Sequence, residues 1–522
     1  MTGSRNAGFR AQRLLNAGRL EFRLPQKPEA PLVNKKLEVQ AHYDLIVIGS
    51  GPAGRRAAVQ GAKLKKRVLV VERGRRVGGV SVHTGTIPSK TLRETVLNLS
   101  GWRERGFYGR AYRAKQDITA ADLRKRLNIT LDHEVEVLEH QFARNTVDTV
   151  IGAARFVDSN TVEVDSASGA ATYSADRFVI AVGTRPYRPG HIGFDGENIV
   201  DSDEILNLGR IPRQLVVVGA SVIGVEYASI FSALDVKVTI VEPQASVLPF
   251  LDRELADEFV HDLRDRGVAI RFHAKVTGAT VQGPESCLVS LADGRQLRAD
   301  MVLFSAGREG AVDALNLAAC GLEADERGRL AVDKASFQTA QPHIYAAGDV
   351  VGFPSLASTS MEQGRIACCH AFDQPAHKAP EFFPYGIYSV PEISTIGMSE
   401  EQARERGIPY ECGVARFRET SRGHIMGISS GFLKMLFAIE TRRLLGVHIV
   451  GEGATELIHI GQAVLNLEGA LDYFVENTFN FPTLAEAYKV AALDAWNRMP
   501  RRQPSREATI VKLELAAKAV NG

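Results

Sequence analysis

The 522-residue sequence has few cysteines and no long uninterrupted hydrophobic run. The five cysteines are Cys287, Cys320, Cys368, Cys369 and Cys412. They form neither a C-x-x-C pair nor the spacing of a zinc site, so we predict no metal centre. An odd number of thiols without a disulfide framework predicts a reducing compartment, here the cytoplasm. No segment reaches the roughly 18 apolar residues of a membrane span. The net charge of +2 gives no reason to expect a nucleic-acid partner.

The amino-terminal region has no acidic residue before Glu21. It also lacks the hydrophobic run of a secretory signal. It carries several arginines, and a proline-rich stretch follows at 24–32. We expect residues 1–41 to form a disordered tail, with an organellar targeting peptide as the alternative. Residues 500–522 are expected to form a second tail.

The chain is long enough for about two to four domains, and one structural unit occurs twice. Residues 43–48 read as a buried parallel strand that runs into a glycine-rich turn and a helix of small residues. The same pattern returns at 215–242. From about residue 380 the pattern changes to antiparallel strands followed by helices. We therefore predict an α/β fold with two Rossmann-like dinucleotide-binding domains and a C-terminal α+β domain.

The first turn is Gly49-x-Gly51-x-x-Gly54, and Glu72 ends the next strand. The three glycines permit a tight turn, close approach of a pyrophosphate and close packing of the helix on the strand. The helix N-terminus offers amide donors to phosphates, and Glu72 stands where an acid accepts hydrogen bonds from a ribose. The turn predicts a dinucleotide site.

The second turn, Gly219-x-Ser221-x-x-Gly224, has serine in place of the middle glycine, and Glu242 stands at the ribose position. A side chain here occupies space next to a pyrophosphate, although the hydroxyl can itself bind phosphate. We expect a second nucleotide site; the alternative is a structural repeat that no longer binds a ligand.

Further motifs resemble those of the flavoprotein disulfide reductases, over residues 42–498. They are Gly78-Gly79, Gly85-Thr-Ile-Pro-Ser-Lys90, Ala181-Val-Gly-Thr-Arg-Pro186, Ser305-Ala-Gly-Arg308 and Ala346-Ala-Gly-Asp349. The resemblance implies an FAD-binding domain at 42–187 and 301–379, an NAD(P)-binding domain at 188–300 and a dimerisation domain at 380–499. It also implies a homodimer, and it leaves larger assemblies open.

The resemblance assigns further site residues. Gly79, Thr86, Gly183 and Asp349 would join the first turn around FAD, with Asp349 at the ribityl chain. Gly307 would join the second turn around the nicotinamide nucleotide. Lys90 and Glu226 would form an ion pair beside flavin N5 and stabilise negative charge there; the alternative is that Lys90 is only a solvated helix residue.

The sequence departs from these reductases where they carry their redox chemistry. Ser81 and Thr86 replace the two cysteines, and Phe481 replaces the acid–base histidine. A hydroxyl cannot exchange between thiol and disulfide, so disulfide reduction is excluded. Glu486, which would orient that histidine, is expected to be structural.

One subgroup shares these departures, the soluble pyridine nucleotide transhydrogenases, to which Val82-His-Thr-Gly-Thr-Ile-Pro-Ser-Lys90 is similar. The resemblance implies FAD-dependent hydride transfer from NADPH to NAD⁺ with ping-pong kinetics. Two other functions stay open: an NADH dehydrogenase that reduces a quinone, dye or partner protein, and a redox sensor or assembly protein without turnover.

Glu242 bears on the choice of nucleotide. A carboxylate at this position suits the 2′-hydroxyl of NAD(H) and repels the 2′-phosphate of NADP(H) by roughly 3 kcal/mol per unit charge at about 5 Å. The following loop has no arginine, although Arg253 could pair with the acid. The sequence therefore predicts NAD(H) binding more firmly than NADP(H) binding.

Overall fold

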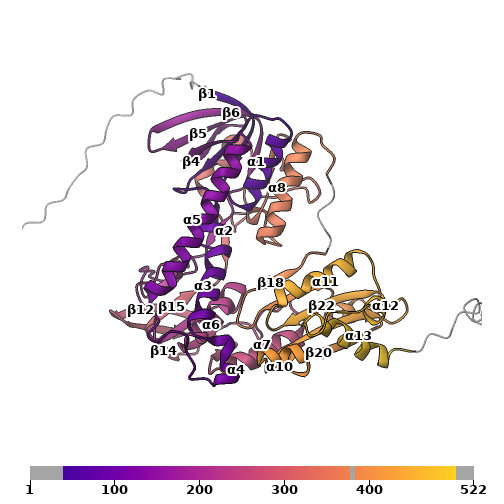
Figure 1. Cartoon of the computed structure of the whole chain (residues 1–522). Helices are drawn as coiled ribbons and strands as arrows, with labels where there is room; N and C mark the ends of the chain where they lie inside the picture. Colours follow the sequence, from indigo (N-terminus) through magenta and orange to yellow (C-terminus); the bar gives the residue numbers. More distant parts are fainter. Residues whose placement is uncertain (1–38, 377–381, 501–522) are drawn as a thin grey trace, which may run out of the picture. The chain divides into compact units, whose positions relative to one another are not determined.

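A computed structural model describes residues 39–376 and 382–500 of the chain (Figure 1). Most of the expected amino-terminal tail, the expected carboxy-terminal tail beyond residue 500 and the expected boundary at residues 379 and 380 lie outside these ranges. The strand β1 (Val39–Ile48) begins inside the segment expected to be a tail, so residues 39–41 are part of the fold.

The first sheet has the strand order β3-β2-β1-β6-β5-β4, and β17 pairs with the last residues of β6, beyond the stretch that pairs with β5. The pairings between β3 and β2, β2 and β1, β1 and β6, and β6 and β17 are parallel. The pairings of β4 with β5 and of β5 with β6 are antiparallel and form a meander. The strands span β2 (Val68–Glu72), β3 (Asp148–Ile151), β4 (Ala153–Asp158), β5 (Thr161–Ser166), β6 (Gly169–Ile180) and β17 (Ile344–Ala346).

Two helices far apart in sequence pack together beside this sheet, α1 (Pro52–Lys63) and α8 (Ala357–Ala371) (Figure 1). A Cβ atom added to Gly364 of α8 would lie 2.0 Å from the carbonyl oxygen of Ala53 in α1. Only glycine permits this approach, so the two helices fix each other's position.

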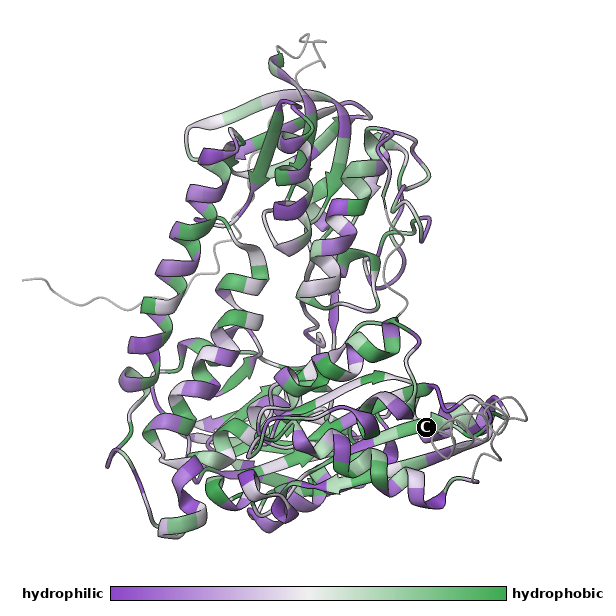
Figure 2. Ribbon diagram, turned by 45° about the vertical axis from the view of Figure 1, so that its right-hand side comes forward, coloured by the Kyte–Doolittle hydropathy of each residue, from purple (hydrophilic) through white to green (hydrophobic). Residues whose placement is uncertain are grey.

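Four helices follow β2 along the chain: α2 (Gly79–His83), α3 (Thr86–Leu99), α4 (Arg105–Tyr108) and α5 (Ala120–Arg144). Thr119 and Asp122 form a capping box at the start of α5. Leu123, Leu127 and Leu138 are among its buried residues, and hydrophobic and hydrophilic residues alternate along it (Figure 2). The helix α5 is therefore amphipathic, with these leucines on its buried side.

The second sheet is parallel throughout, in the order β11-β10-β9-β15-β8. Its strands are β8 (Ile199–Asp201), β9 (Gln214–Val218), β10 (Lys237–Val241), β11 (Ala269–Arg271) and β15 (Met301–Phe304). We assigned residues 301–304 to the FAD-binding domain, but β15 pairs with β9 and β8, so strand pairing places it in the second sheet. The chain returns to the first sheet only after β15.

Opposite faces of the second sheet are covered differently. The helices α6 (Val222–Ala233) and α7 (Arg253–Asp265) pack on one face, and the antiparallel strands β12 (Val276–Gly283), β13 (Ser286–Leu291) and β14 (Gln296–Ala299) pack on the other. A two-stranded ladder, β7 (Thr184–Pro186) with β16 (Arg308–Gly310), joins the segment that leaves the first sheet to the segment that returns to it.

The third sheet is antiparallel, in the order β18-β19-β22-β21-β20. Its strands are β18 (Tyr385–Ile387), β19 (Ile393–Gly397), β20 (Tyr410–Arg416), β21 (Phe432–Ala438) and β22 (Leu444–Val450). The helices of this region are α9 (Glu400–Glu405), α10 (Ser421–Met426), α11 (Ala454–Asn466), α12 (Leu471–Glu476) and α13 (Glu486–Arg498) (Figure 1).

A buried charged cluster joins the second and third sheets. Lys434 of β21 is 1% exposed at its side chain, and its Nζ lies 3.0 Å from Asp252 Oδ1 and 3.0 Å from Glu254 Oε2. Lys434 also donates a hydrogen bond to Glu400 of α9. Asp252 caps α7 by accepting from the amide of Glu254, so this cluster holds the start of α7 against the third sheet.

The predicted fold class is confirmed: two Rossmann-like α/β regions and a C-terminal α+β region. Within the described ranges, no helix is long and apolar enough to cross a membrane.

Candidate functional site

A cavity of about 1760 Å³ lies where the first turn, α3, the β7–β16 ladder, the second turn and the loop after β18 meet. Most of the predicted site residues line it: Gly49, Gly51, Glu72, Gly79, Thr86, Lys90, Gly183, Ser221, Glu226, Gly307 and Asp349. The others, Gly54, Gly219, Gly224 and Glu242, lie in the turns beside it and do not line it.

The first turn has the geometry of a dinucleotide site. Gly49 has φ +101°, and a Cβ atom there would lie 2.4 Å from Ala181 O; one on Gly54 would lie 1.9 Å from Gly49 O. Both positions therefore require glycine. A Cβ atom on Gly51 would meet no protein atom within 4 Å. Gly51 thus borders open space at the N-terminus of α1, where a phosphate group can approach the backbone.

The second turn repeats this backbone at Gly219 and Gly224, with φ +100° at Gly219. Ser221 is the N-cap residue of α6, and its hydroxyl donates to the carbonyl oxygen of Ser305 at 3.2 Å. The hydroxyl is therefore already engaged by the protein.

The two acids that follow the turns are held in the same way. Glu72 accepts hydrogen bonds from the amides of Ser50 and Gly74 at 3.0 and 2.7 Å. Glu242 accepts from the amides of Ala220 and Gln244 at 2.6 and 2.8 Å. Both acids are buried. The expected alternative pairing of Glu242 with Arg253 does not form, since the Arg253 side chain is 83% exposed and lies 3.6 Å from Asp257.

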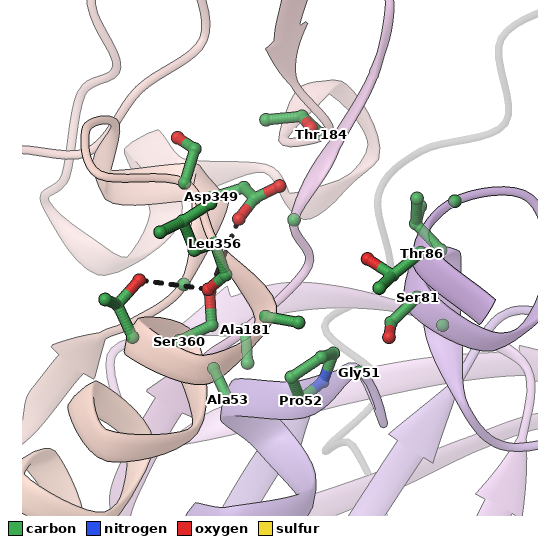
Figure 3. A pocket seen from close by; sticks show the side chains of 18 of the residues that line it. Gly51, Pro52, Ala53, Ser81, Thr86, Ala181, Thr184, Asp349, Leu356 and Ser360 are labelled. Atoms are coloured by element: carbon green, nitrogen blue, oxygen red, sulfur yellow. Dashed lines mark hydrogen bonds between the residues drawn. The ribbon is translucent and has the colours of Figure 1, made fainter. Parts of the chain in front are cut away.

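Asp349 projects into the cavity from the short helix that begins with it (Figure 3). Its Oδ1 accepts a hydrogen bond of 3.3 Å from the hydroxyl of Ser360. Burial raises the pKa of Asp349, and the charge of Arg308 and the hydrogen bonds from Ser360 and Thr184 only partly offset this effect. A half-buried carboxylate with so few donors can accept further hydrogen bonds from ligand hydroxyls.

Ser81 and Thr86 face the cavity from α2 and α3, on the side opposite Asp349 and Ser360 (Figure 3). No cysteine lines the cavity in the described part of the chain. The five thiols are free, and burial raises the pKa values of Cys287 and Cys320 to about 11. None of them can replace the missing redox pair.

Lys90 and Glu226 meet inside the cavity from α3 and α6. Lys90 Nζ lies 2.7 Å from Glu226 Oε1 and 2.8 Å from Oε2. The side chains are 25% and 5% exposed. The expected ion pair is therefore present, and its role beside a flavin stays a prediction.

Several cavity residues were missed by the sequence analysis. Arg308, quoted only as part of a motif, donates to Thr184 Oγ1 and to the Thr184 carbonyl oxygen at 2.9 Å each, and its Nη1 lies 3.3 Å from Asp203 Oδ1. It thereby links the β7–β16 ladder to the second sheet. Tyr385 and Tyr388 enter from the third sheet, where no nucleotide motif marks them.

Val222, the first residue of α6, lines the cavity. An aromatic pair lies elsewhere in the cavity wall, with the ring centroids of Phe250 and Tyr385 5.0 Å apart. Phe481 is 67% exposed, and Glu486 Oε2 has no hydrogen-bond partner within the described ranges.

Comparison with known families supports one relationship over most of the chain. Residues 43–364 match the family described as pyridine nucleotide-disulphide oxidoreductase, and residues 383–492 match the dimerisation domain of that family. Together the two matches include all three sheets.

Curated relatives carry one name. The chain is 51% identical over 459 residues to the soluble pyridine nucleotide transhydrogenase of Mycobacterium tuberculosis, covering 88% of this chain and 98% of that protein. It is 43% identical over 466 residues to the soluble pyridine nucleotide transhydrogenase of Vibrio cholerae, covering 88% and 99%.

Two solved structures show the same fold at lower identity. The flavoprotein disulfide reductase RclA of Escherichia coli matches with a TM-score of 0.78 and 27% identity, over 86% of this chain and 99% of that one. LpdA of Mycobacterium tuberculosis matches with a TM-score of 0.79 and 26% identity, over 86% and 99%.

Proposed function

Because the chain belongs to the pyridine nucleotide-disulphide oxidoreductase family, we propose that it transfers a hydride between pyridine nucleotides with FAD as its cofactor. The observation that carries the proposal is the composition of one cavity. The cavity contains a dinucleotide turn and the Lys90–Glu226 ion pair, and it has the hydroxyl side chains of Ser81 and Thr86 where a redox pair would need cysteines. Two relatives of the chain, at 51% and 43% identity, are named soluble pyridine nucleotide transhydrogenases.

The residues of the first region fit FAD. Gly51 leaves open space at the start of α1 for a pyrophosphate, and Glu72 is buried beside it at the position of a ribose acceptor. The sparsely paired carboxylate of Asp349 is suited to accept hydrogen bonds from the ribityl hydroxyls. When bound, FAD supplies a group that accepts a hydride from one nicotinamide and returns it to another.

Lys90 and Glu226 would act electrostatically. The ammonium of Lys90 is mostly shielded from water, where a fixed charge acts more strongly than in bulk solvent. It would stabilise negative charge that develops near it, and Glu226 would hold it in place. One nicotinamide pocket would serve both nucleotides in turn, so we propose ping-pong kinetics, with Val222 leaving exchange unobstructed.

We propose binding of NAD(H) and binding of NADP(H) from two different observations. Glu242 suits the 2′-hydroxyl of NAD(H), since its carboxylate is fixed by two amides and cannot move away without losing them. For NADP(H) we propose that Arg271 receives the 2′-phosphate. Arg271 ends β11, and its carbonyl oxygen accepts the amide of Glu242 at 2.9 Å.

The side chain of Arg271 is suited to an anion. Its Nε is buried and has no hydrogen-bond partner, and its guanidinium forms no ion pair within the described ranges. An unpaired guanidinium two strands from the second turn would offset the repulsion between Glu242 and a phosphate. His273, two residues after Arg271, donates a hydrogen bond from its backbone amide to the carbonyl oxygen of Gln244 at 3.2 Å.

The remaining assignments complete the proposal. We propose residues 42–187 with the segment after β15 as the FAD-binding domain, 188–304 as the NAD(P)-binding domain and 380–499 as the dimerisation domain of a homodimer. The free thiols fit a reducing compartment, for which we propose the cytoplasm. Tyr473 of α12 and Leu493 and Trp496 of α13 are exposed apolar side chains, and we propose that they contribute to the interface with the partner.

The decisive experiment is anaerobic hydride exchange between NADPH and a thio-NAD⁺ analogue, followed at the absorbance of reduced thio-NAD. We expect turnover with parallel double-reciprocal lines. Flavin reduction by NADH without exchange, together with turnover on a quinone, would instead establish an NADH dehydrogenase. A flavin that no nicotinamide nucleotide reduces would establish a protein without turnover.

A further inference from the structure

A loop of the third sheet is inserted beside the Lys90–Glu226 pair. It joins β18 to β19 and is attached to both other regions of the fold. Its Tyr388 amide donates to Glu226 Oε1 at 2.8 Å, and its Val390 amide donates to the hydroxyl of Ser229, one turn along α6, at 2.9 Å. Its Ser389 carbonyl oxygen accepts from Arg93 Nε of α3 at 2.8 Å.

The side chain of Tyr388 also reaches Lys90. The Tyr388 ring centroid lies 5.0 Å from Lys90 Nζ. The face of an aromatic ring attracts a cation, and the attraction grows when water is excluded. The ammonium of Lys90 is thus held by the two oxygens of Glu226 and by the face of one ring.

From these contacts we infer that Tyr388 is a positioning residue for the Lys90–Glu226 pair, and that it keeps the ammonium at one place in the cavity wall. The inference rests on the proposed function, because that place is where a flavin would feel the charge. Lysine has a flexible stem and loses much rotamer freedom when it is fixed. A carboxylate alone leaves the ammonium free to pivot, whereas a second contact from another direction restricts it.

The backbone and side-chain contributions of Tyr388 can be separated. The hydrogen bond to Glu226 comes from the main chain, and the anchors at Ser229 and Arg93 use neighbouring residues. A substitution at Tyr388 therefore leaves the loop attached at all three points and changes only the side-chain contacts, which are the ring contact with Lys90 and a hydrogen bond with Thr455. Phenylalanine retains the ring face, and leucine removes it.

The test uses the FAD-loaded protein and two measurements that do not require transhydrogenation: the flavin midpoint potential and the rate of anaerobic flavin reduction by NADH. We expect Tyr388→Leu to lower the potential, in the same direction as we expect for Lys90→Met, and to slow reduction about fivefold, the effect of losing one such contact. Tyr388→Phe should match the parent protein in both measurements.

A double-mutant cycle decides whether Tyr388 acts through Lys90. In a Lys90→Met background, Tyr388→Leu should change neither the potential nor the rate further. Equal effects of Tyr388→Leu in both backgrounds would overturn the inference and assign the ring to packing alone. So would a Tyr388→Phe protein that behaves like Tyr388→Leu.

A second variant covers the case in which leucine impairs folding or FAD binding. Pentafluorophenylalanine at position 388 keeps the shape of the ring and reverses the charge distribution of its face. It should behave like leucine in both measurements; behaviour like phenylalanine would refute a cation–ring contact. The potential can be measured with dithionite and dyes, so it remains available if no nicotinamide nucleotide reduces the flavin, a result that would count against the proposed function alone.

Discussion

Glu72 and Glu242 occupy equivalent places, at the end of β2 and directly after β10. Each accepts a hydrogen bond from one amide of its glycine turn and from the amide of the residue two positions after itself. A carboxylate held this way is part of the turn as well as of the ligand site. The equivalence makes the two acids controls for each other.

Replacing Glu242 by Gln should shift the nucleotide preference toward NADP(H). The amide keeps an acceptor for the turn but removes the charge that repels a 2′-phosphate. NADH should lose about tenfold in kcat/KM, in the range for one weakened hydrogen bond to a charged group. The quantity to follow is the ratio of kcat/KM for NADPH and NADH. Glu72→Gln should lower FAD retention and leave that ratio unchanged; an equal shift in both variants would contradict the assignment.

Arg271→Gln should weaken NADPH and spare NADH. Loss of a charge-assisted hydrogen bond to the phosphate predicts a decrease in kcat/KM for NADPH of about ten- to a hundredfold. Arg253→Gln is the matched control, because Arg253 is exposed and lies beside Asp257, away from Glu242. If both nucleotides lose equally in Arg271→Gln, the arginine supports the strand and does not read the phosphate.

The protein should carry about one FAD per chain, and Asp349→Ala should lose most of it during purification. The substitution removes the sparsely paired acceptor expected at the ribityl chain. Absorbance at 450 nm relative to protein measures the content, and Ser360→Ala, which removes only the weak donor to Asp349, should retain FAD. An Asp349→Ala protein that retains its full FAD content would show that Asp349 does not hold the cofactor.

Lipoamide, glutathione and mercuric ion should not be reduced, since Ser81 and Thr86 carry hydroxyl groups. The two-electron reduced protein should also lack the long-wavelength absorbance that a thiolate gives beside a flavin. Arsenite sensitivity of turnover is the sharpest check. Inhibition by arsenite would mean that a dithiol operates in the cycle.

Lys434→Met should destabilise the fold by about 3–5 kcal/mol at pH 7, because it leaves the buried carboxylate of Asp252 and the partly buried carboxylate of Glu400 without their cation. Burial opposes ionisation of Asp252, but His448, Lys434 and the Glu400 amide together lower its pKa. Its stabilising contribution is therefore present above the pKa of an unfolded aspartate, about 3.9, and is lost as the pH falls through the lower folded value.

The difference between Lys434→Met and the parent protein should accordingly shrink below about pH 4. Urea unfolding at pH 7 and pH 3.5 measures it. Arg443→Met, which breaks an exposed pair with Glu468, should change stability by no more than about 1 kcal/mol at either pH. A pH-independent difference would show that Lys434 contributes by packing.

Local patterns predicted the parts of the site that a single turn encodes. Gly49, Gly54 and Glu72 stand at fixed spacing, because one strand, one turn and one helix determine where they lie. The Lys90–Glu226 contact came from resemblance, since the two residues are 136 positions apart. The boundary near residue 301 was misplaced because β15 is a short apolar strand, and apolar character does not reveal which of two sheets will pair with it.

Tyr388 and Arg271 carried no sequence signal. The Tyr388 contact depends on how the loop after β18 meets α3 and α6, and this relationship exists only in the folded protein. No local sequence pattern distinguishes Arg271 from other arginines at strand ends. Only the structure reveals that its Nε is buried without a hydrogen-bond partner among the described residues. The orientation of Glu242 was also beyond the sequence, because it depends on two backbone amides.

The close packing of Gly364 against Ala53 has a consequence for how the chain is made. The first sheet and its helices need β17, Asp349 and α8, which follow the whole second sheet in sequence. At about 5–20 residues per second, a ribosome needs on the order of tens of seconds to pass from α1 to α8. During that interval all strands of the inserted second sheet are made, while α1 can pack on β1 and β2 but lacks its contact with α8. The second region can therefore pack before the first region is complete, and a chain terminated before α8 lacks the helix that packs against α1.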